Sequence, residues 1–112
     1  MAPPPVFLGD LEQMVLLATL HLGDGAYAVP IRHELAARAR REIARGALYT
    51  TLDRLEAKGY LRSRVGEPIP ERGGRSRRYY TVTASGIAAL RTSCEALRGL
   101  YHGLEAILGR TP

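Results

Sequence analysis

The sequence predicts a mainly α-helical fold in which three helices are followed by a two-stranded hairpin and a long C-terminal helix. Apolar residues recur at helical spacing in residues 10–22, 29–39 and 43–59. The period then changes to two in residues 61–65 and 78–83, on either side of a segment rich in proline and glycine. A heptad spacing follows in residues 87–108. The 112 residues suit a single domain.

The first helix is predicted to begin at Asp10, as an N-cap with Gln13 at the third helical position, and to end at Gly23. Its inward positions are Leu11, Met14, Val15, Ala18 and Leu22. Other leucines, such as Leu17 and Leu20, extend the apolar surface to further faces. We therefore expect this helix to lie between the domain and a second surface.

The second helix is predicted over residues 29–39, with Pro30 in its first turn, where the missing N–H costs nothing. Ile31, Leu35 and Ala39 form its inward stripe. In the third helix the inward residues are Leu48, Leu52 and Leu55. Gly59 is its predicted C-terminal stop.

The first strand places Leu61, Ser63 and Val65 on one face and two arginines on the other. The second strand, residues 78–83, is rich in aromatic and β-branched residues, and we expect Tyr79 or Tyr80 to be buried. Residues 66–77 join the two strands as a long loop. This loop is predicted to project from the domain and to be basic, through Arg72, Arg75 and Arg77.

The last helix is predicted to start at a Thr83 N-cap and to run to about Leu108. Its apolar residues alternate steps of three and four: Ile87, Leu90, Cys94, Leu97, Tyr101, Leu104 and Leu108. A strict period of 3.5 favours packing against another long helix. Because no other segment is long enough, a second copy of the same helix is the expected partner, and the protein is predicted to be a homodimer.

The charge is concentrated in the middle of the chain. Sixteen basic residues stand against 11 acidic ones, for a net charge of +5, and residues 32–80 alone carry a net charge of +7. Such a basic block predicts a face that binds a polyanion such as nucleic acid. A solvated, arginine-rich surface with no ligand is the alternative that charge by itself leaves open.

Several classes of protein are excluded by what the sequence lacks. The single cysteine, Cys94, forms no intramolecular disulfide, and the three histidines show no metal-binding spacing, so we expect neither metal, cofactor nor catalytic site. The longest apolar stretch, residues 14–22, is too short to span a membrane. With no basic residue before Arg32, no secretory leader is expected either, and we predict a cytoplasmic protein.

Three helices followed by a hairpin is the order of a winged helix-turn-helix domain, whose third helix reads DNA in the major groove. With the leucines of this helix turned inward, its outer face carries Arg45, Gly46, Tyr49, Thr50 and Arg54, beside Asp53. Arginine can contact guanine or phosphate, the Tyr and Thr hydroxyls suit phosphate oxygens, and glycine permits a close backbone approach. These residues, with the three loop arginines, are the predicted DNA-binding site.

The sequence resembles the PadR family of bacterial transcriptional regulators over about residues 8–90. The similarity lies in a Gly-x-Leu-Tyr element at Gly46, Leu48 and Tyr49, in spaced leucines, and in an aromatic, Arg-rich second wing strand. The matching residues further along are Leu52, Leu55, Glu56, Gly59, Gly73, Gly74, Arg75, Arg78, Tyr79, Tyr80, Thr83 and Gly86. The single C-terminal helix resembles the short subclass of the family, in which this helix mediates dimerisation.

This chain departs from the family at two points. Ala44 stands where members often place a capping serine, and alanine is a poor cap. Members that bind planar drugs at the dimer interface often stack them on tryptophan, which this chain lacks, so drug binding is not carried over and a small-molecule effector stays open.

The sequence thus predicts a flexible tail (residues 1–7), a winged helix-turn-helix domain (residues 8–83) and a dimerisation helix (residues 84–112). The resemblance implies a homodimeric regulator that binds double-stranded DNA at an inverted repeat, as a repressor. The alternative is a winged-helix module that binds an acidic protein partner.

Overall fold

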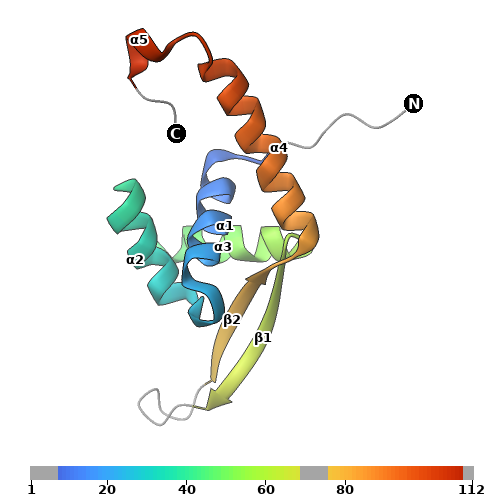
Figure 1. Ribbon diagram of the computed structural model, residues 1–112. Helices are drawn as coiled ribbons and strands as arrows, with labels where there is room; N and C mark the ends of the chain where they lie inside the picture. The colour runs from blue at the N-terminus through green and yellow to red at the C-terminus, as the bar shows by residue number, and fades with distance from the viewer. Residues whose placement is uncertain (1–7, 69–75, 110–112) are drawn as a thin grey trace, which may run out of the picture.

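The computed structural model describes residues 8–68 and 76–109. Its elements, in chain order, are α1 (Asp10–Leu22), a single 3-10 turn (Gly23–Gly25), α2 (Ala28–Ala39), α3 (Arg45–Ala57), β1 (Leu61–Pro68), β2 (Ser76–Val82), α4 (Ala84–Tyr101) and α5 (Glu105–Leu108). The order of three helices, a hairpin and a C-terminal helix is confirmed (Figure 1). The predicted tail of residues 1–7 and the loop arginines Arg72 and Arg75 lie outside the described residues.

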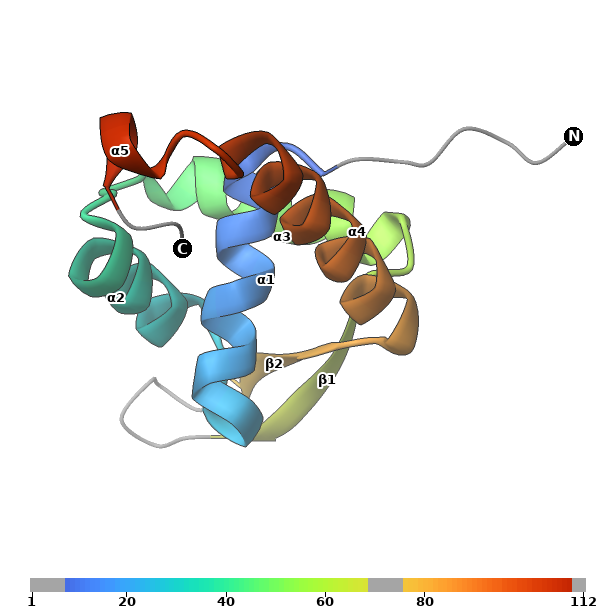
Figure 2. The ribbon, with the colours of Figure 1, turned by 45° about the horizontal axis from the view of Figure 1, so that its top comes forward.

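Helix α1 is the centre of the fold. It lies between α2 and α4 (Figure 2) and also contacts α3 and β2. Its Val15 and Leu16 are fully buried, and so are Ile31 of α2 and the three predicted leucines of α3. One predicted inward residue is wrong: Ala39, in the last turn of α2, is exposed. By that turn, α2 has run past the core.

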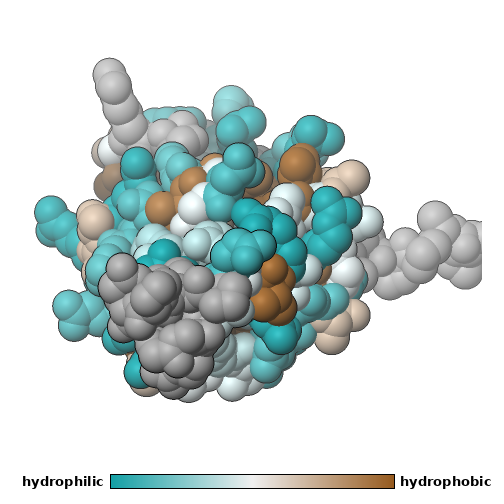
Figure 3. All heavy atoms as spheres, turned by 90° about the horizontal axis from the view of Figure 1, so that it is seen from below, coloured by the Kyte–Doolittle hydropathy of each residue, from teal (hydrophilic) through white to brown (hydrophobic). Residues whose placement is uncertain are grey.

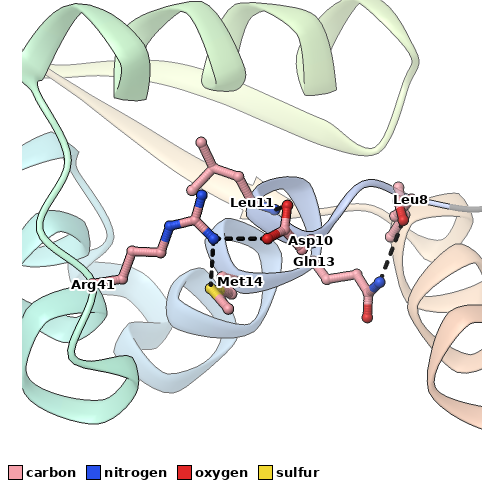
Figure 4. A network of polar contacts seen from close by, with 6 residues as sticks. All are labelled: Leu8, Asp10, Leu11, Gln13, Met14 and Arg41. Carbon is pink, nitrogen blue, oxygen red and sulfur yellow. Dashed lines mark hydrogen bonds and ion pairs between the residues drawn. The ribbon is translucent and has the colours of Figure 1, made fainter. Parts of the chain in front are cut away.

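The start of α1 differs from the prediction, because its N-cap is Gly9 and not Asp10. Glu12 reaches back so that its Oε1 accepts a hydrogen bond from the Gly9 N–H at 3.0 Å. Asp10 instead accepts from the Leu11 N–H and pairs with Arg41 Nη1 at 2.8 Å (Figure 4). This contact ties the connection between α2 and α3 to the first turn of α1.

The hairpin is longer than predicted, because β1 runs to Pro68 and β2 starts at Ser76. Arg77, expected in the loop, therefore belongs to a strand. Val65, predicted on the same face as Leu61, is 65% exposed whereas Leu61 is buried, since this part of the hairpin extends beyond the core. Tyr80 is buried as expected, and burial raises the pKa of its hydroxyl. Its N–H donates to the Ala26 carbonyl at 2.8 Å and so joins β2 to the segment before α2.

Helix α4 begins as predicted, with the Thr83 hydroxyl accepting a hydrogen bond from the Gly86 N–H at 3.1 Å. The prediction of one helix to Leu108 is wrong, because α4 ends at Tyr101 and the separate turn α5 follows. Gly103 has a φ of +90°, in the left-handed region, which breaks the helical path. The first half of α4 is part of the core, and Ser93 Oγ accepts a hydrogen bond from the Leu8 N–H at 3.2 Å.

Candidate nucleic-acid interface

Helix α3 has one buried and one exposed face. Leu48, Leu52 and Leu55 have no exposed surface, whereas the opposite face carries only exposed residues: Arg45, Gly46, Tyr49, Thr50, Asp53 and Arg54. The same leucine spacing that anchors the helix therefore turns every predicted DNA-binding residue of α3 toward solvent. Tyr49, at 41% exposure, lies partly against the domain with much of its ring accessible.

The first turn of α3 is open. Its N-cap is Ala44, which has an extended backbone and makes no side-chain cap. The amide groups of the first turn have no acceptor within a helix, and they lie at the positive end of its dipole. Apart from its chain neighbours and the backbone of its own helix, no described atom lies within 4 Å of the position that a Cβ on Gly46 would take. This end of α3 can therefore approach an anionic surface closely.

An open groove of about 490 Å³ lies between α2 and the start of α3. Arg32 and His33 of α2 and Glu42 of the connection contribute its polar wall, and Val29 and Ile43 are among its apolar residues. Arg32 was not among the predicted site residues. The structure brings this arginine beside the helix that carries the predicted site.

Three residues of the basic block form ion pairs with acidic residues of the same chain. Arg38 pairs with Glu34 at 2.7 Å, Arg41 with Asp10 at 2.8 Å, and Lys58 with Glu12 at 2.7 Å. The hydrogen bond from Arg41 lowers the pKa of the Asp10 carboxyl. Burial raises the pKa of Glu12, but the hydrogen bonds from Lys58 and from the Gly9 N–H outweigh it, so that the net shift is downward.

Other arginines of the basic block lie on α3 and the hairpin. Within residues 8–68 and 76–109, no acidic side chain lies within ion-pairing distance of Arg45, Arg54, Arg62, Arg64 or Arg78, all of which are exposed. Figure 3, which views the molecule from the hairpin end, shows hydrophilic residues across this face with smaller hydrophobic patches between them. The structure thus places arginines that have no acidic partner among the described residues on the outer face of α3 and on the hairpin.

Arg77 lies apart from this exposed group. It is half-buried, and its guanidinium carbon lies 4.3 Å from the centre of the Tyr27 ring. Sequence analysis gave Arg77 no structural task and did not consider Tyr27. The only signal for this contact was that both residues flank predicted elements, and that cannot predict a contact 50 residues apart in sequence.

The apolar surface lies on the distal half of α4 and on α5. Leu97, Leu100, Tyr101, Leu104 and Leu108 line a shallow depression there, and Leu100 is 75% exposed. Cys94 is a free, half-buried cysteine beside Leu97 and Tyr101. Ile87 is 40% exposed, but Leu90 is 5% exposed and belongs to the core of its own chain. The predicted dimerisation residues thus separate into one core residue and an accessible set.

The described part of the chain holds no group of three or more His, Cys, Asp or Glu side chains placed to bind a metal ion. None of its helices has both the length and the apolar character needed to cross a membrane.

The comparisons with known proteins agree with this geometry. The model of the PadR-like family of transcriptional regulators matches residues 16–92. A transcriptional regulator from Clostridium thermocellum has a similar structure, with a TM-score of 0.70 and 25% identity over 88% of this chain and 92% of that one. A PadR-like transcription factor from Bacteroides fragilis gives a TM-score of 0.68 and 28% identity over 87% and 88% of the two chains.

A PadR family regulator from Eggerthella lenta gives a TM-score of 0.66 and 25% identity over 91% of this chain and 88% of that one. Among curated proteins, none matches the sequence. The matched region runs from the middle of α1 into α4 and so includes the helices, the hairpin and the exposed face of α3. The chain is a winged-helix protein that belongs to the PadR-like family of transcriptional regulators.

Proposed function

We propose that this protein is a homodimeric, sequence-specific DNA-binding repressor that covers a promoter by binding an inverted repeat. The observation that carries the proposal is the exposed face of α3, where Arg45, Tyr49, Thr50 and Arg54 project from a helix whose other face is locked into the core. A rigid helix with a polar, arginine-bearing outer face is what readout in the major groove requires.

The hairpin would supply contacts to the DNA backbone. Arg62, Arg64 and Arg78 project from its strands without acidic partners among the described residues. Arg72 and Arg75 belong to the same proposed site. Contacts of this kind position a protein on the duplex, while residues on α3 select the sequence.

The dimer would form through the distal half of α4 and through α5. A cluster of exposed apolar side chains on a small domain is typical of a protein interface. Its residues are Leu97, Leu100, Tyr101, Leu104 and Leu108, with Ile87 and Cys94 nearer the core. A twofold dimer would place two α3 helices about 34–36 Å apart, in successive major grooves.

The experiment is selection of genomic fragments with the purified protein, followed by mobility shifts of the recovered fragment and of a scrambled duplex at several salt concentrations. We expect preference for the recovered fragment, an inverted repeat within it, and affinity that falls steeply as salt rises. Arg45→Ala and Arg54→Ala should weaken binding. Arg38→Ala, which removes the same charge from an ion pair on α2, should not.

Equal binding of the two duplexes would contradict sequence-specific recognition. Failure to bind any duplex, together with capture of an acidic protein through the same arginines, would replace the proposal by a protein-interaction module. Affinity that does not change with salt would contradict the arginine contacts to phosphate.

A further inference from the structure

Four side chains form a column that joins the wing to the segment before α2, and we call it the Tyr27 stack. The guanidinium of Arg77 lies over the Tyr27 ring at 4.3 Å. The Tyr27 ring meets the Tyr79 ring edge to face, with 5.6 Å between centres, and the guanidinium of Arg64 lies over Tyr79 at 4.7 Å. Two cations thus enclose two aromatic rings, an arrangement in which each contact is attractive.

The position of Tyr27 connects the hairpin to α2. Tyr27 is the N-cap of α2, and its carbonyl accepts the first hydrogen bond of that helix, from the Ile31 N–H at 3.1 Å. The preceding Ala26 accepts the hydrogen bond from Tyr80 of β2. Tyr27 is therefore attached to α2 through its backbone and to the hairpin through its ring.

Two features of the hairpin accommodate the Tyr27 stack. A Cβ on Gly66 would lie 2.7 Å from Cε2 of Tyr79, so the absence of a side chain at Gly66 leaves room for the ring. Arg64 and Tyr79 are directly opposite each other in the hairpin register. Any shift of the hairpin relative to α2 would separate the two rings and break the contact of Arg77 with Tyr27.

Arg77 is held by the ring and by no carboxylate of the described residues. Its Nε is buried, with no hydrogen-bond partner in that part of the chain. The planar guanidinium has its orientation set by the aromatic face below it. A cation oriented in this way is suited to a phosphate oxygen of a DNA strand.

We propose that Tyr27 is a positioning residue for DNA binding, which acts by fixing Arg77 and the loop end of the hairpin relative to α2. The proposal rests on the proposed DNA-binding function and adds to it a residue outside both α3 and the wing. The ligand is the sugar-phosphate backbone of duplex DNA, so the effect is independent of sequence.

The experiment measures binding of a random-sequence DNA duplex by fluorescence anisotropy over a range of salt concentrations. The variants are Tyr27→Leu, Tyr27→Phe, Arg77→Gln, Arg78→Gln and the combinations of Tyr27→Leu with each arginine substitution. Phe keeps the ring, so Tyr27→Phe is the matched control for the stack. Arg78 is adjacent to Arg77 but exposed and outside the stack, so Arg78→Gln is the matched control for charge.

We expect Tyr27→Leu and Arg77→Gln each to weaken binding roughly fivefold and to reduce the salt slope by about one. Tyr27→Phe should bind as the unmodified protein does. Tyr27→Leu should add nothing to Arg77→Gln, because both remove the same contact, but it should add its full effect to Arg78→Gln.

Additive losses with Arg77→Gln, or a Tyr27→Leu variant with unchanged affinity and salt slope, would overturn the positioning role. Should Tyr27→Leu fail to fold, Arg77→Gln decides: an affinity and a salt slope equal to those of the unmodified protein overturn the proposal. In either case, retained binding of the duplex by the unmodified protein leaves the proposed function standing. Absence of duplex binding by the unmodified protein would remove both.

Discussion

Glu12 is a nearly buried carboxylate that connects two helix ends. One of its oxygens accepts from the N–H of the α1 N-cap at 3.0 Å, and the other accepts from Lys58, the C-cap of α3, at 2.7 Å. Both partners are hydrogen-bond donors, so both favour the ionised form. The carboxylate therefore fixes the end of α3 against the start of α1, and through it the direction of the DNA-reading helix.

Replacing Glu12 by Gln should lower the free energy of unfolding by about 1–3 kcal/mol at neutral pH, because a buried charge-assisted bond to Lys58 is lost. The pKa of Glu12 in the folded state is below its ordinary value of 4.5, so its contribution is complete above that pH and disappears as the pH falls through the folded pKa. Denaturant unfolding of both proteins between neutral pH and pH 3 checks this. A difference that persists unchanged at the acid end would contradict it.

Leu55 anchors α3 from the inside. It has no exposed surface, and its removal leaves a cavity between α3 and the rest of the core. Leu55→Ala should lower the free energy of unfolding by about 2–5 kcal/mol in chemical denaturation. Val65→Ala, at a hairpin position that is 65% exposed, is the control and should change it little. Equal effects of the two substitutions would show that α3 is not held by this leucine.

At the scale of elements, the junction of β2 and α4 depends on one glycine. Gly86 lies in the first turn of α4, where a Cβ would collide with the carbonyl oxygen of Tyr60 and lie 2.8 Å from Cγ1 of Val82. Because the first collision is with backbone, it cannot be relieved by a rotamer change. The close approach of α4 to the turn before β1 therefore requires glycine at this position.

Gly86→Ala should accordingly lower Tm by several degrees, on the scale of about 1–3 kcal/mol for overpacking at a rigid site. Gly99→Ala is the matched control, since Gly99 lies in the same helix with nothing within 4 Å of the Cβ position, and it should preserve or raise Tm. Thermal unfolding followed by circular dichroism distinguishes the two. A Gly86→Ala protein as stable as the unmodified one would show that α4 can move away from Tyr60.

The elements also show what could be predicted from sequence. Helix α3 and its exposed face followed directly from three leucines at positions 48, 52 and 55, because burial of one stripe determines the opposite face. The end of α4 could not be predicted in this way, since the heptad pattern continues past Gly103 although the backbone turns there with a φ of +90°. The Tyr27 stack was missed because its contacts join residues far apart in the chain, which no local period can indicate.

At the scale of the whole molecule, the polar and apolar surfaces lie at opposite ends. The hairpin projects from one end of the domain, and the distal half of α4 and α5 lie at the other (Figure 1). Binding of DNA and pairing of chains could therefore occur together without competing for the same residues.

Leu97→Glu should convert the proposed dimer into a monomer, because it places a charge within the apolar surface of α4, where Leu97 is 46% exposed. Sedimentation velocity at micromolar concentration measures this. Val65→Glu adds the same charge at the exposed hairpin and should leave the sedimentation coefficient unchanged. Monomeric behaviour of the unmodified protein would contradict the proposed assembly.

Helix α4 runs without interruption from the buried Gly86 and Ser93 to the accessible Tyr101. The buried half and the accessible half belong to one continuous helix, so they move together. A rotation of the distal half by a bound partner would therefore be transmitted to the core and, through the hydrogen bond of Ser93 with Leu8, to the segment before α1.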